Sequence, residues 1–180
     1  MKVIPPITIT SALLTSSTAA EPGPGETAWN AATSYTLGAR AIRTTTHRIY
    51  EAVAAGVHAG LPEDTPSRWL DVGPTNRYAM FDLERNSATS VASPLTVVIT
   101  PGRRVNSIAL IGVVAQNVTI TMTVLGSNVY TYTEDLTTRA TLSWYDYFYG
   151  TFGTAPTVVR FDLPPYTNGV ITVTLTAASG

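Results

Sequence analysis

Apolar residues alternate with threonine over long stretches of the C-terminal half of the chain. Residues 118–124 read Val-Thr-Ile-Thr-Met-Thr-Val, and residues 170–176 read Val-Ile-Thr-Val-Thr-Leu-Thr. A period of two sends successive side chains to opposite faces of a β-strand, so both segments predict strands with one buried face. Shorter β-branched runs predict further strands, at residues 95–99, 105–114, 129–133 and 157–163.

Turn signals separate these predicted strands. They are Pro101-Gly102, Gly126-Ser127-Asn128, Pro164-Pro165 and Tyr166-Thr167-Asn168-Gly169. Several short strands with regular turns, and no amphipathic helical pattern, predict an all-β fold. We therefore expect residues 83–180 to form an antiparallel β-sandwich of the jelly-roll or galactose-binding-like type.

The middle of the chain, residues 28–82, has a less regular pattern. Residues 39–43 and 48–53 predict two short strands, and Thr44-Thr45-Thr46-His47 is the turn between them. The resulting small β-hairpin module needs its Trp and Tyr side chains as a core, because so short a segment has few other large apolar residues.

The first 27 residues are rich in Pro, Thr, Ser and Gly. The run Glu21-Pro22-Gly23-Pro24-Gly25-Glu26 is incompatible with a helix or a central strand. Residues 1–27 are therefore predicted to be an extended N-terminal arm. Such an arm either docks the protein onto a partner or is an unattached terminus, and the composition is compatible with both.

Composition narrows the class of protein. The 180 residues carry a net charge of -1, and only 13% of them are charged, whereas threonine fills roughly one position in six. The 44% hydrophobic content allows a packed core, and the absence of cysteine excludes disulfides, cysteine zinc sites and a cysteine nucleophile. The 11 basic residues are scattered among 12 acidic ones, so nucleic acid is not an expected partner.

A surface with so little charge has weak colloidal repulsion and favours assembly with other subunits, including a homo-oligomer.

Targeting signals are not apparent. No run of 18 apolar residues exists, so membrane insertion is not expected, and the prolines at positions 5 and 6 interrupt any secretory signal. We expect the chain to be made in a cytoplasm.

The sequence contains no familiar catalytic motif. The nucleophile elbow, the phosphate-binding loop and the dinucleotide fingerprint are all missing, which predicts a protein that is not an enzyme and needs no cofactor. His47 and His58 are expected on loop surfaces. The acidic pairs Glu63-Asp64 and Glu134-Asp135 are interpreted as solvated turn charges, because adjacent residues of a strand point to opposite faces. Structural calcium held by Asp135, Asp146 or Asp162 is a weaker alternative to the expectation of no metal.

Residues 144–152 contain a cluster of aromatic residues, Trp-Tyr-Asp-Tyr-Phe-Tyr-Gly-Thr-Phe. On a strand, Tyr145, Tyr147 and Tyr149 would share one face and Trp144 and Phe148 the other. Tyrosine is common at interfaces because it offers a large ring with a polar tip. The tyrosine face is therefore a candidate surface for another subunit or a glycan, unless the chain's own loops cover it.

Residues 28–72 resemble the small carbohydrate-binding modules of families 5 and 12. The resemblance is carried by Ala28-Trp29, Tyr35-Thr36-Leu37-Gly38, Ile49-Tyr50-Glu51-Ala52, Leu61-Pro62 and Trp69. It implies carbohydrate binding by Trp29, Tyr35, Tyr50 and Trp69. The same four residues are alternatively the core of a tiny fold, and the family's further sugar-stacking aromatics are replaced here by Val53-Ala54-Ala55-Gly56.

The segment Gly73-Pro74-Thr75-Asn76-Arg77-Tyr78-Ala79-Met80-Phe81-Asp82, set between such a module and a sandwich, is similar to proteins of tailed bacteriophages. Tyr78, Met80 and Phe81 would pack as a hinge between the two domains, or form an ordinary linker strand. The resemblance implies a structural virion protein of the tail tip, baseplate or fibre, located in the tail. Other tail proteins are then its expected partners, and a host-surface glycan is a further one. A carbohydrate-binding module that recognises host glycans is the alternative function.

Overall fold

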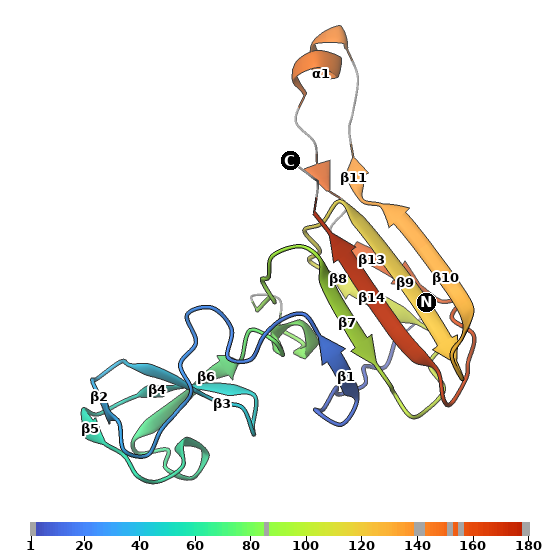
Figure 1. Cartoon of the computed structure of the whole chain (residues 1–180). Coiled ribbons are helices and arrows are strands. Elements are labelled where there is room, and N and C mark those ends of the chain that lie inside the picture. Colours follow the sequence, from blue (N-terminus) through green and yellow to red (C-terminus); the bar gives the residue numbers. More distant parts are fainter. Residues whose placement is uncertain (1–2, 85–86, 139–142, 151–152, 155–156, 178–180) are drawn as a thin grey trace. The chain divides into compact units, whose positions relative to one another are not determined.

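The computed structural model describes residues 3–84, 87–138, 143–150, 153–154 and 157–177. Nearly all of its regular structure is antiparallel β-sheet, which confirms the predicted all-β class. The chain divides into two compact units: Met1–Thr18 with Val91–Gly180, and Ala19–Ser90 (Figure 1).

The larger unit is built on a five-stranded sheet with the strand order β1-β7-β14-β9-β10. The strands are β1 (Leu14–Ser17), β7 (Leu95–Ile99), β14 (Val170–Thr176), β9 (Asn117–Val124) and β10 (Ser127–Asp135). The two threonine-alternating segments are thus neighbouring interior strands of the sheet, β14 at its centre and β9 beside it.

The register of the sheet explains the threonine alternation. Thr174 pairs with Thr96 on one side and Thr119 on the other, and Thr119 pairs with Thr133. The four side chains form a row across one face, with hydroxyl oxygens 3.4 Å apart both between Thr96 and Thr174 and between Thr119 and Thr133. The intervening apolar residues turn to the opposite face. Threonine therefore supplies the β-branched shape that suits a strand without placing charge on the outer face.

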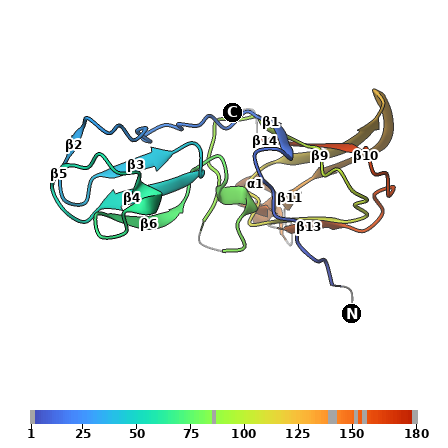
Figure 2. The same ribbon diagram turned by 90° about the horizontal axis from the view of Figure 1, so that it is seen from below.

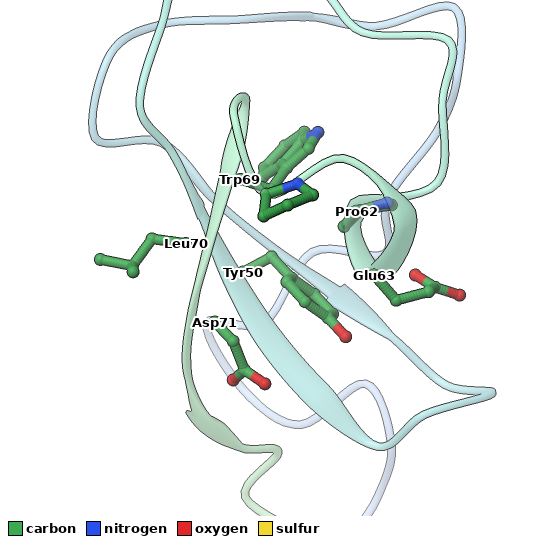
Figure 3. A pocket seen from close by; sticks show the side chains of 7 residues that line it. Tyr50, Pro62, Glu63, Trp69, Leu70 and Asp71 are labelled. Atoms are coloured by element: carbon green, nitrogen blue, oxygen red, sulfur yellow. The ribbon is translucent and has the colours of Figure 1, made fainter.

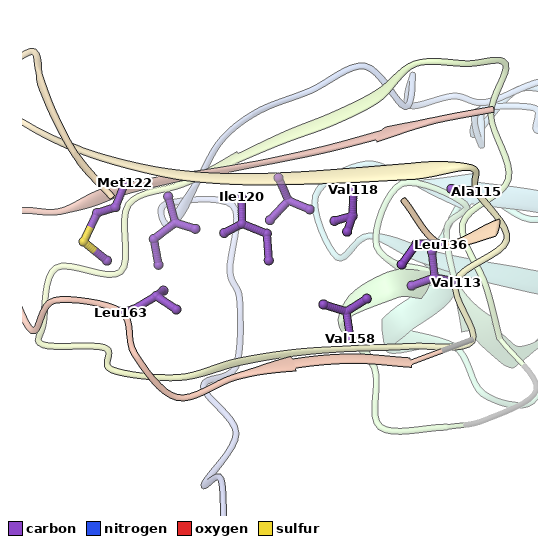
Figure 4. Packing of buried hydrophobic residues seen from close by; sticks show 10 residues of the cluster. Val113, Ala115, Val118, Ile120, Met122, Leu136, Val158 and Leu163 are labelled. Carbon is purple, nitrogen blue, oxygen red and sulfur yellow. The ribbon is translucent and has the colours of Figure 1, made fainter. Parts of the chain in front are cut away.

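A second, two-stranded layer covers the apolar face of this sheet. It consists of β8 (Ile108–Ile111) and β13 (Thr157–Arg160). The buried cluster between the layers is Val113, Ala115, Val118, Ile120, Met122, Leu136, Val158, Leu163, Ile171 and Val173 (Figure 4). Each fully buried aliphatic side chain of this kind stabilises the fold by roughly 1.5–3 kcal/mol, so the two layers hold together as a sandwich-like core.

The turn between β9 and β10 lies one residue earlier than predicted. Leu125 and Gly126 form it, with φ angles of +50° and +82°. Both central residues of a type I′ hairpin turn need positive φ, which suits the right-handed twist of the flanking strands. Glycine adopts that conformation readily, whereas leucine does not.

The aromatic segment is a short helix, and its prediction as a strand was wrong. α1 (Trp144–Tyr149) lies along the chain between the short paired strands β11 (Thr137–Thr138) and β12 (Gly153–Thr154), and Figure 1 shows it beyond the end of the five-stranded sheet. Helical spacing brings residues four apart together, so Trp144 meets Phe148 and Tyr145 meets Tyr149. Residues 151 and 152 lie outside the described residues.

The smaller unit contains the predicted hairpin. β3 (Arg40–Arg43) pairs with β4 (Arg48–Ala52), and β4 pairs with β6 (Trp69–Pro74). β2 (Ser34–Tyr35) and β5 (Gly56–Val57) form a separate pair at one end of the unit (Figures 1 and 2). The unit also has two single-turn 3₁₀ helices, η1 (Pro62–Asp64) and η2 (Ala79–Phe81).

The unit boundaries differ from those expected from composition, which were residues 27 and 82. The expected arm is divided between the units: β1 pairs with β7 in the larger one, and residues from Ala19 onward belong to the smaller one. Glu26 shows how the Pro/Gly run is fixed, because its carboxylate accepts hydrogen bonds from the backbone N–H groups of Gly23 and Asn76 at 2.6 and 2.7 Å. Within the run, the Gly23 N–H is satisfied by this side chain, and the Glu26 N–H donates to the carbonyl oxygen of Gly23.

Candidate functional site

The four aromatic residues predicted to bind carbohydrate lie in or against the core of the smaller unit. Tyr35, Tyr50 and Trp69 are only 6%, 5% and 2% exposed. Trp29 packs against this cluster, and the Arg43 guanidinium lies 5.1 Å from the centre of its ring. Tyr35 meets Trp69 edge to face at 4.9 Å. The rings thus pack on one another as a core and do not form an exposed stacking platform.

A pocket of about 240 Å³ opens beside two of these rings (Figure 3). Its walls come from β4, η1 and β6, and the lining residues are Tyr50, Pro62, Glu63, Pro66, Trp69, Leu70 and Asp71. The pocket combines rings and prolines with two carboxylates, a mixture that accommodates a ligand with an apolar face and hydroxyl donors.

Both carboxylates of the pocket are paired with arginines. Glu63 is held by Arg43 at 3.0 Å, and Asp71 by Arg48 at 2.8 Å. Partial burial acts to raise the pKa of Glu63, but the hydrogen bonds from Arg43 and from the backbone, together with the positive charge of Arg43, hold that pKa below its usual range. The interpretation of Glu63 as a solvated turn charge was therefore wrong, because β3 places Arg43 over η1. The carboxylate oxygens of both residues can also accept hydrogen bonds from a hydroxyl group of a ligand.

Two buried indole N–H groups lack a hydrogen-bond acceptor within the described residues. They belong to Trp29 and Trp69. A buried donor without a partner costs roughly 1–3 kcal/mol, and most native structures avoid it. Trp69 belongs to the aromatic core of the smaller unit and also lines the pocket, and Trp29 packs against that core.

A polar cluster in the smaller unit surrounds His47. Its Nδ1 lies 2.9 Å from Glu21 Oε2, and its ring stacks on Tyr78 with centroids 3.8 Å apart. Thr75 Oγ1 donates to the other Glu21 oxygen at 2.6 Å. Burial, followed by the nearby Glu21 carboxylate, raises the pKa of Tyr78. The cluster anchors the chain near Glu21 to the turns after β3 and β6.

Neither histidine is the loop-surface residue that was expected. The side chain of His47 is 20% exposed, because Glu21 and Tyr78 cover it. His58 is 8% exposed, and its Nε2 lies 2.8 Å from the carbonyl oxygen of Ala54. The ring of His58 also meets Trp69 edge to face at 5.8 Å. The turn that contains His58 thus folds back onto the aromatic core, whereas His47 lies in the polar cluster with Glu21 and Tyr78.

The aromatic residues of α1 are far more exposed than those of the module. Trp144, Tyr145, Tyr147, Phe148 and Tyr149 are between 54% and 79% exposed. Their rings contact one another; Trp144 stacks on Phe148 with centroids 6.3 Å apart, and Tyr145 lies 5.1 Å from Tyr149. The three tyrosines predicted as one interface face therefore remain exposed, and they are joined by Trp144 and Phe148.

Two of the three aspartates considered as calcium ligands have partners within the chain. Asp162 binds Arg160 and accepts a hydrogen bond from the Tyr130 hydroxyl, and Asp135 accepts one from Thr137. The side chain of Asp146 lies outside the described residues. In the described part of the chain, no group of three or more His, Cys, Asp or Glu side chains is placed to hold a metal ion. Among the helices that the structure describes, none has the length and apolar character needed to cross a membrane.

Comparisons with known proteins found no match to a family model, to a curated protein or to a solved structure.

Sequence reasoning named four of the seven pocket residues, Tyr50, Pro62, Glu63 and Trp69, but did not bring them together in one site. Pro62 was part of the module resemblance, but Pro66, Leu70 and Asp71 carried no motif. The feature of the sequence that could have indicated these residues is the presence of oppositely charged pairs. Arg48 and Asp71 lie on neighbouring strands, and Arg43 faces the turn that contains Glu63.

Proposed function

We propose that this chain is a structural component of a bacteriophage virion, in the tail tip, baseplate or fibre, and that it takes part in attachment to the host surface. The resemblance of residues 73–82 and of the module order to tail proteins supports the first part. The small charge of the chain supports a subunit that is largely covered by neighbours.

The exposed aromatic cluster of α1 is the observation that carries the attachment role. Five large rings exposed to solvent within six residues are unusual for a monomeric protein and mark an interaction site. Rings of Trp and Tyr stack on the apolar faces of sugars and at the same time offer polar tips. In this proposal α1 presents the aromatic surface, and the sandwich-like unit supports it.

The attachment role is tested with the double variant Trp144→Ser/Phe148→Ser introduced into the phage genome. We expect normal particle yield, because the two rings are 79% and 67% exposed, and at least a tenfold slower adsorption to host cells. The matched control is Tyr166→Ser, which removes an aromatic ring that is 44% exposed outside α1. Unchanged adsorption of the double variant, or equal loss in the control, would refute the role of α1.

Carbohydrate binding by the smaller unit is the second candidate, and the pocket beside Trp69 is the observation that favours it. Its volume of about 240 Å³ is below the ~300–1,000 Å³ typical of sites for drug-sized ligands, so a single sugar ring is the expected occupant. Tyr50, Trp69 and the prolines would face the apolar side of the ring. The carboxylates of Glu63 and Asp71 would accept its hydroxyl donors.

This second function is tested by titrating the protein with fragments of host cell-wall glycans while recording tryptophan fluorescence. We expect a saturable change that is weakened at least tenfold in Asp71→Asn and retained in Glu51→Gln, a carboxylate that is paired with Arg40 outside the pocket. No saturable change with any glycan fragment would eliminate the pocket as a sugar site.

A further inference from the structure

β10 forms one outer edge of the five-stranded sheet. It runs over nine residues from Ser127 to Asp135, and β9 is its pairing partner. Among the described residues no backbone hydrogen bond joins β10 to any other strand, and Figure 1 shows no strand on its far side. Its outward N–H and C=O groups therefore form a row that another strand could complete.

Several of the features that usually protect such an edge are absent from β10. The strand contains no lysine, arginine or proline. The opposite edge of the sheet, β1, is only four residues long and is interrupted by a bulge between Leu14 and Ser16. Short and bulged edges resist pairing, whereas a long edge without a basic residue or proline favours it. β10 also has a bulge near its start, but its pairing with β9 is regular from Tyr130 to Asp135.

The side chains on the inner face of β10 hold this edge in place. Tyr130 donates a hydrogen bond from its hydroxyl to Asp162 at 3.0 Å. The Arg160 guanidinium lies 4.0 Å from the centre of the Tyr132 ring. Tyr130 and Tyr132 also pack against the buried cluster of the unit. Because the inner side is anchored, the edge is already in the conformation that a partner strand needs.

We propose that a second copy of this chain pairs with β10 through its own β10 in antiparallel orientation, so that the two sheets become continuous. Charge selects the orientation. Glu134 and Asp135 lie at one end of β10, and Ser127 and Asn128 lie at the other. Antiparallel pairing sets the acidic end of each strand against the neutral end of its partner, whereas parallel pairing in register would oppose Glu134 to Glu134.

The faces of the sheet restrict the register. Tyr130 and Tyr132 occupy the inner face, and Thr131 and Thr133 occupy the outer one. Residues that lie directly opposite each other in an antiparallel pair point to the same face of the sheet. For the inner faces of the two copies to be continuous, the twofold axis must therefore pass between one residue and the same residue of the second copy. Overlap of the whole strand then places the axis at Thr131, where the threonine of each copy faces its counterpart. The outer threonine face would continue across the axis without an opposed pair of like charges.

This pairing would be the contact between copies of the proposed virion subunit. The pairing itself is inferred from the sheet edge, and it rests on the proposed function only for the statement that it occurs in a virion. The test is sedimentation equilibrium of the full chain and of the variant Thr131→Lys. We expect a dimer for the unchanged chain, and at least a tenfold larger dissociation constant for Thr131→Lys, because two lysines would oppose each other at the axis. The control is Ser16→Lys on the other edge, which should leave the dimer intact.

A chemical readout fixes the contact point, since the chain has no cysteine of its own. Oxidised Thr131→Cys should form a disulfide-linked dimer, whereas Thr172→Cys, in the interior strand β14, should not. A monomeric unchanged chain, or a dimer broken by Ser16→Lys and not by Thr131→Lys, would overturn the proposal. A monomer found in purified virions would overturn the pairing alone, and a dimer absent from virions would overturn the virion function alone.

Discussion

Replacement of Trp69 by alanine tests whether the module aromatics form a core. Trp69 begins β6, is 2% exposed, and meets Tyr35 and His58 edge to face at 4.9 and 5.8 Å. Truncation of a buried tryptophan to alanine costs roughly 3–5 kcal/mol. A unit the size of Ala19–Ser90 has a total stability on the order of 4–10 kcal/mol. Trp69→Ala should therefore remove about half or more of the stability of the smaller unit.

The assay is differential scanning calorimetry of the full chain. A loss of about 1 kcal/mol lowers the Tm of a small domain by roughly 4–8 °C, so the transition of the smaller unit should fall by more than about 12 °C. The transition of the larger unit should not move. Trp144→Ala is the matched control, because the same side chain is 79% exposed there and its removal should cost less than about 0.5 kcal/mol.

A Trp69→Ala variant with both transitions unchanged would refute the assignment of these aromatics to the core. A large loss from Trp144→Ala would refute the exposure of α1.

The remaining predictions concern one residue each. The pKa of Glu63 is lowered in the folded state. Its pairing with Arg43 therefore contributes fully to the free energy of unfolding above the unfolded pKa of about 4.3. This contribution is lost as the pH falls through the folded pKa. The stability difference between the unchanged chain and Glu63→Gln, measured by urea unfolding, should be constant above about pH 5 and shrink as the pH falls below about 4.3; a difference that grows with acid would contradict this. Leu125→Asn should raise the stability of the larger unit by about 0.5–1 kcal/mol, because asparagine tolerates the positive φ of this turn, and a lower Tm would exclude that explanation. Ile120→Ala should cost roughly 2–5 kcal/mol since Ile120 is fully buried, whereas Thr121→Ala on the outer face should cost less than 1 kcal/mol; equal losses would contradict the assigned faces.

The strands with strong alternation could be predicted from the sequence. β7 and β14 have the predicted bounds, and β9 begins one residue before its predicted start. The alternation predicts these strands because one face of the sheet is buried and the other is solvated. The polarity of each residue therefore indicates the face to which its side chain points. β1 was missed, since Leu-Thr-Ser-Ser at a sheet edge buries only one large side chain and carries almost no pattern.

The helix α1 shows where propensity misleads. Alternating aromatic residues favour strands because they pack well on a sheet, but that preference depends on neighbouring strands. Among the described residues, no strand covers Trp144 or Tyr145, and their rings instead contact Phe148 and Tyr149, four positions along the helix. The pocket beside Trp69 could not be predicted for a related reason. It requires β4, η1 and β6 to meet, and only the tertiary structure brings Glu63 and Asp71 to the same opening.

The central claim is that this chain is part of a virion, and the protein content of purified particles tests it most directly. Quantitative mass spectrometry of density-purified particles of the phage proposed to encode the chain should detect it at a constant ratio to the other tail proteins. That ratio should persist after high-salt washing and correspond to several copies per tail. A chain that is abundant in the lysate and absent from washed particles would contradict the account.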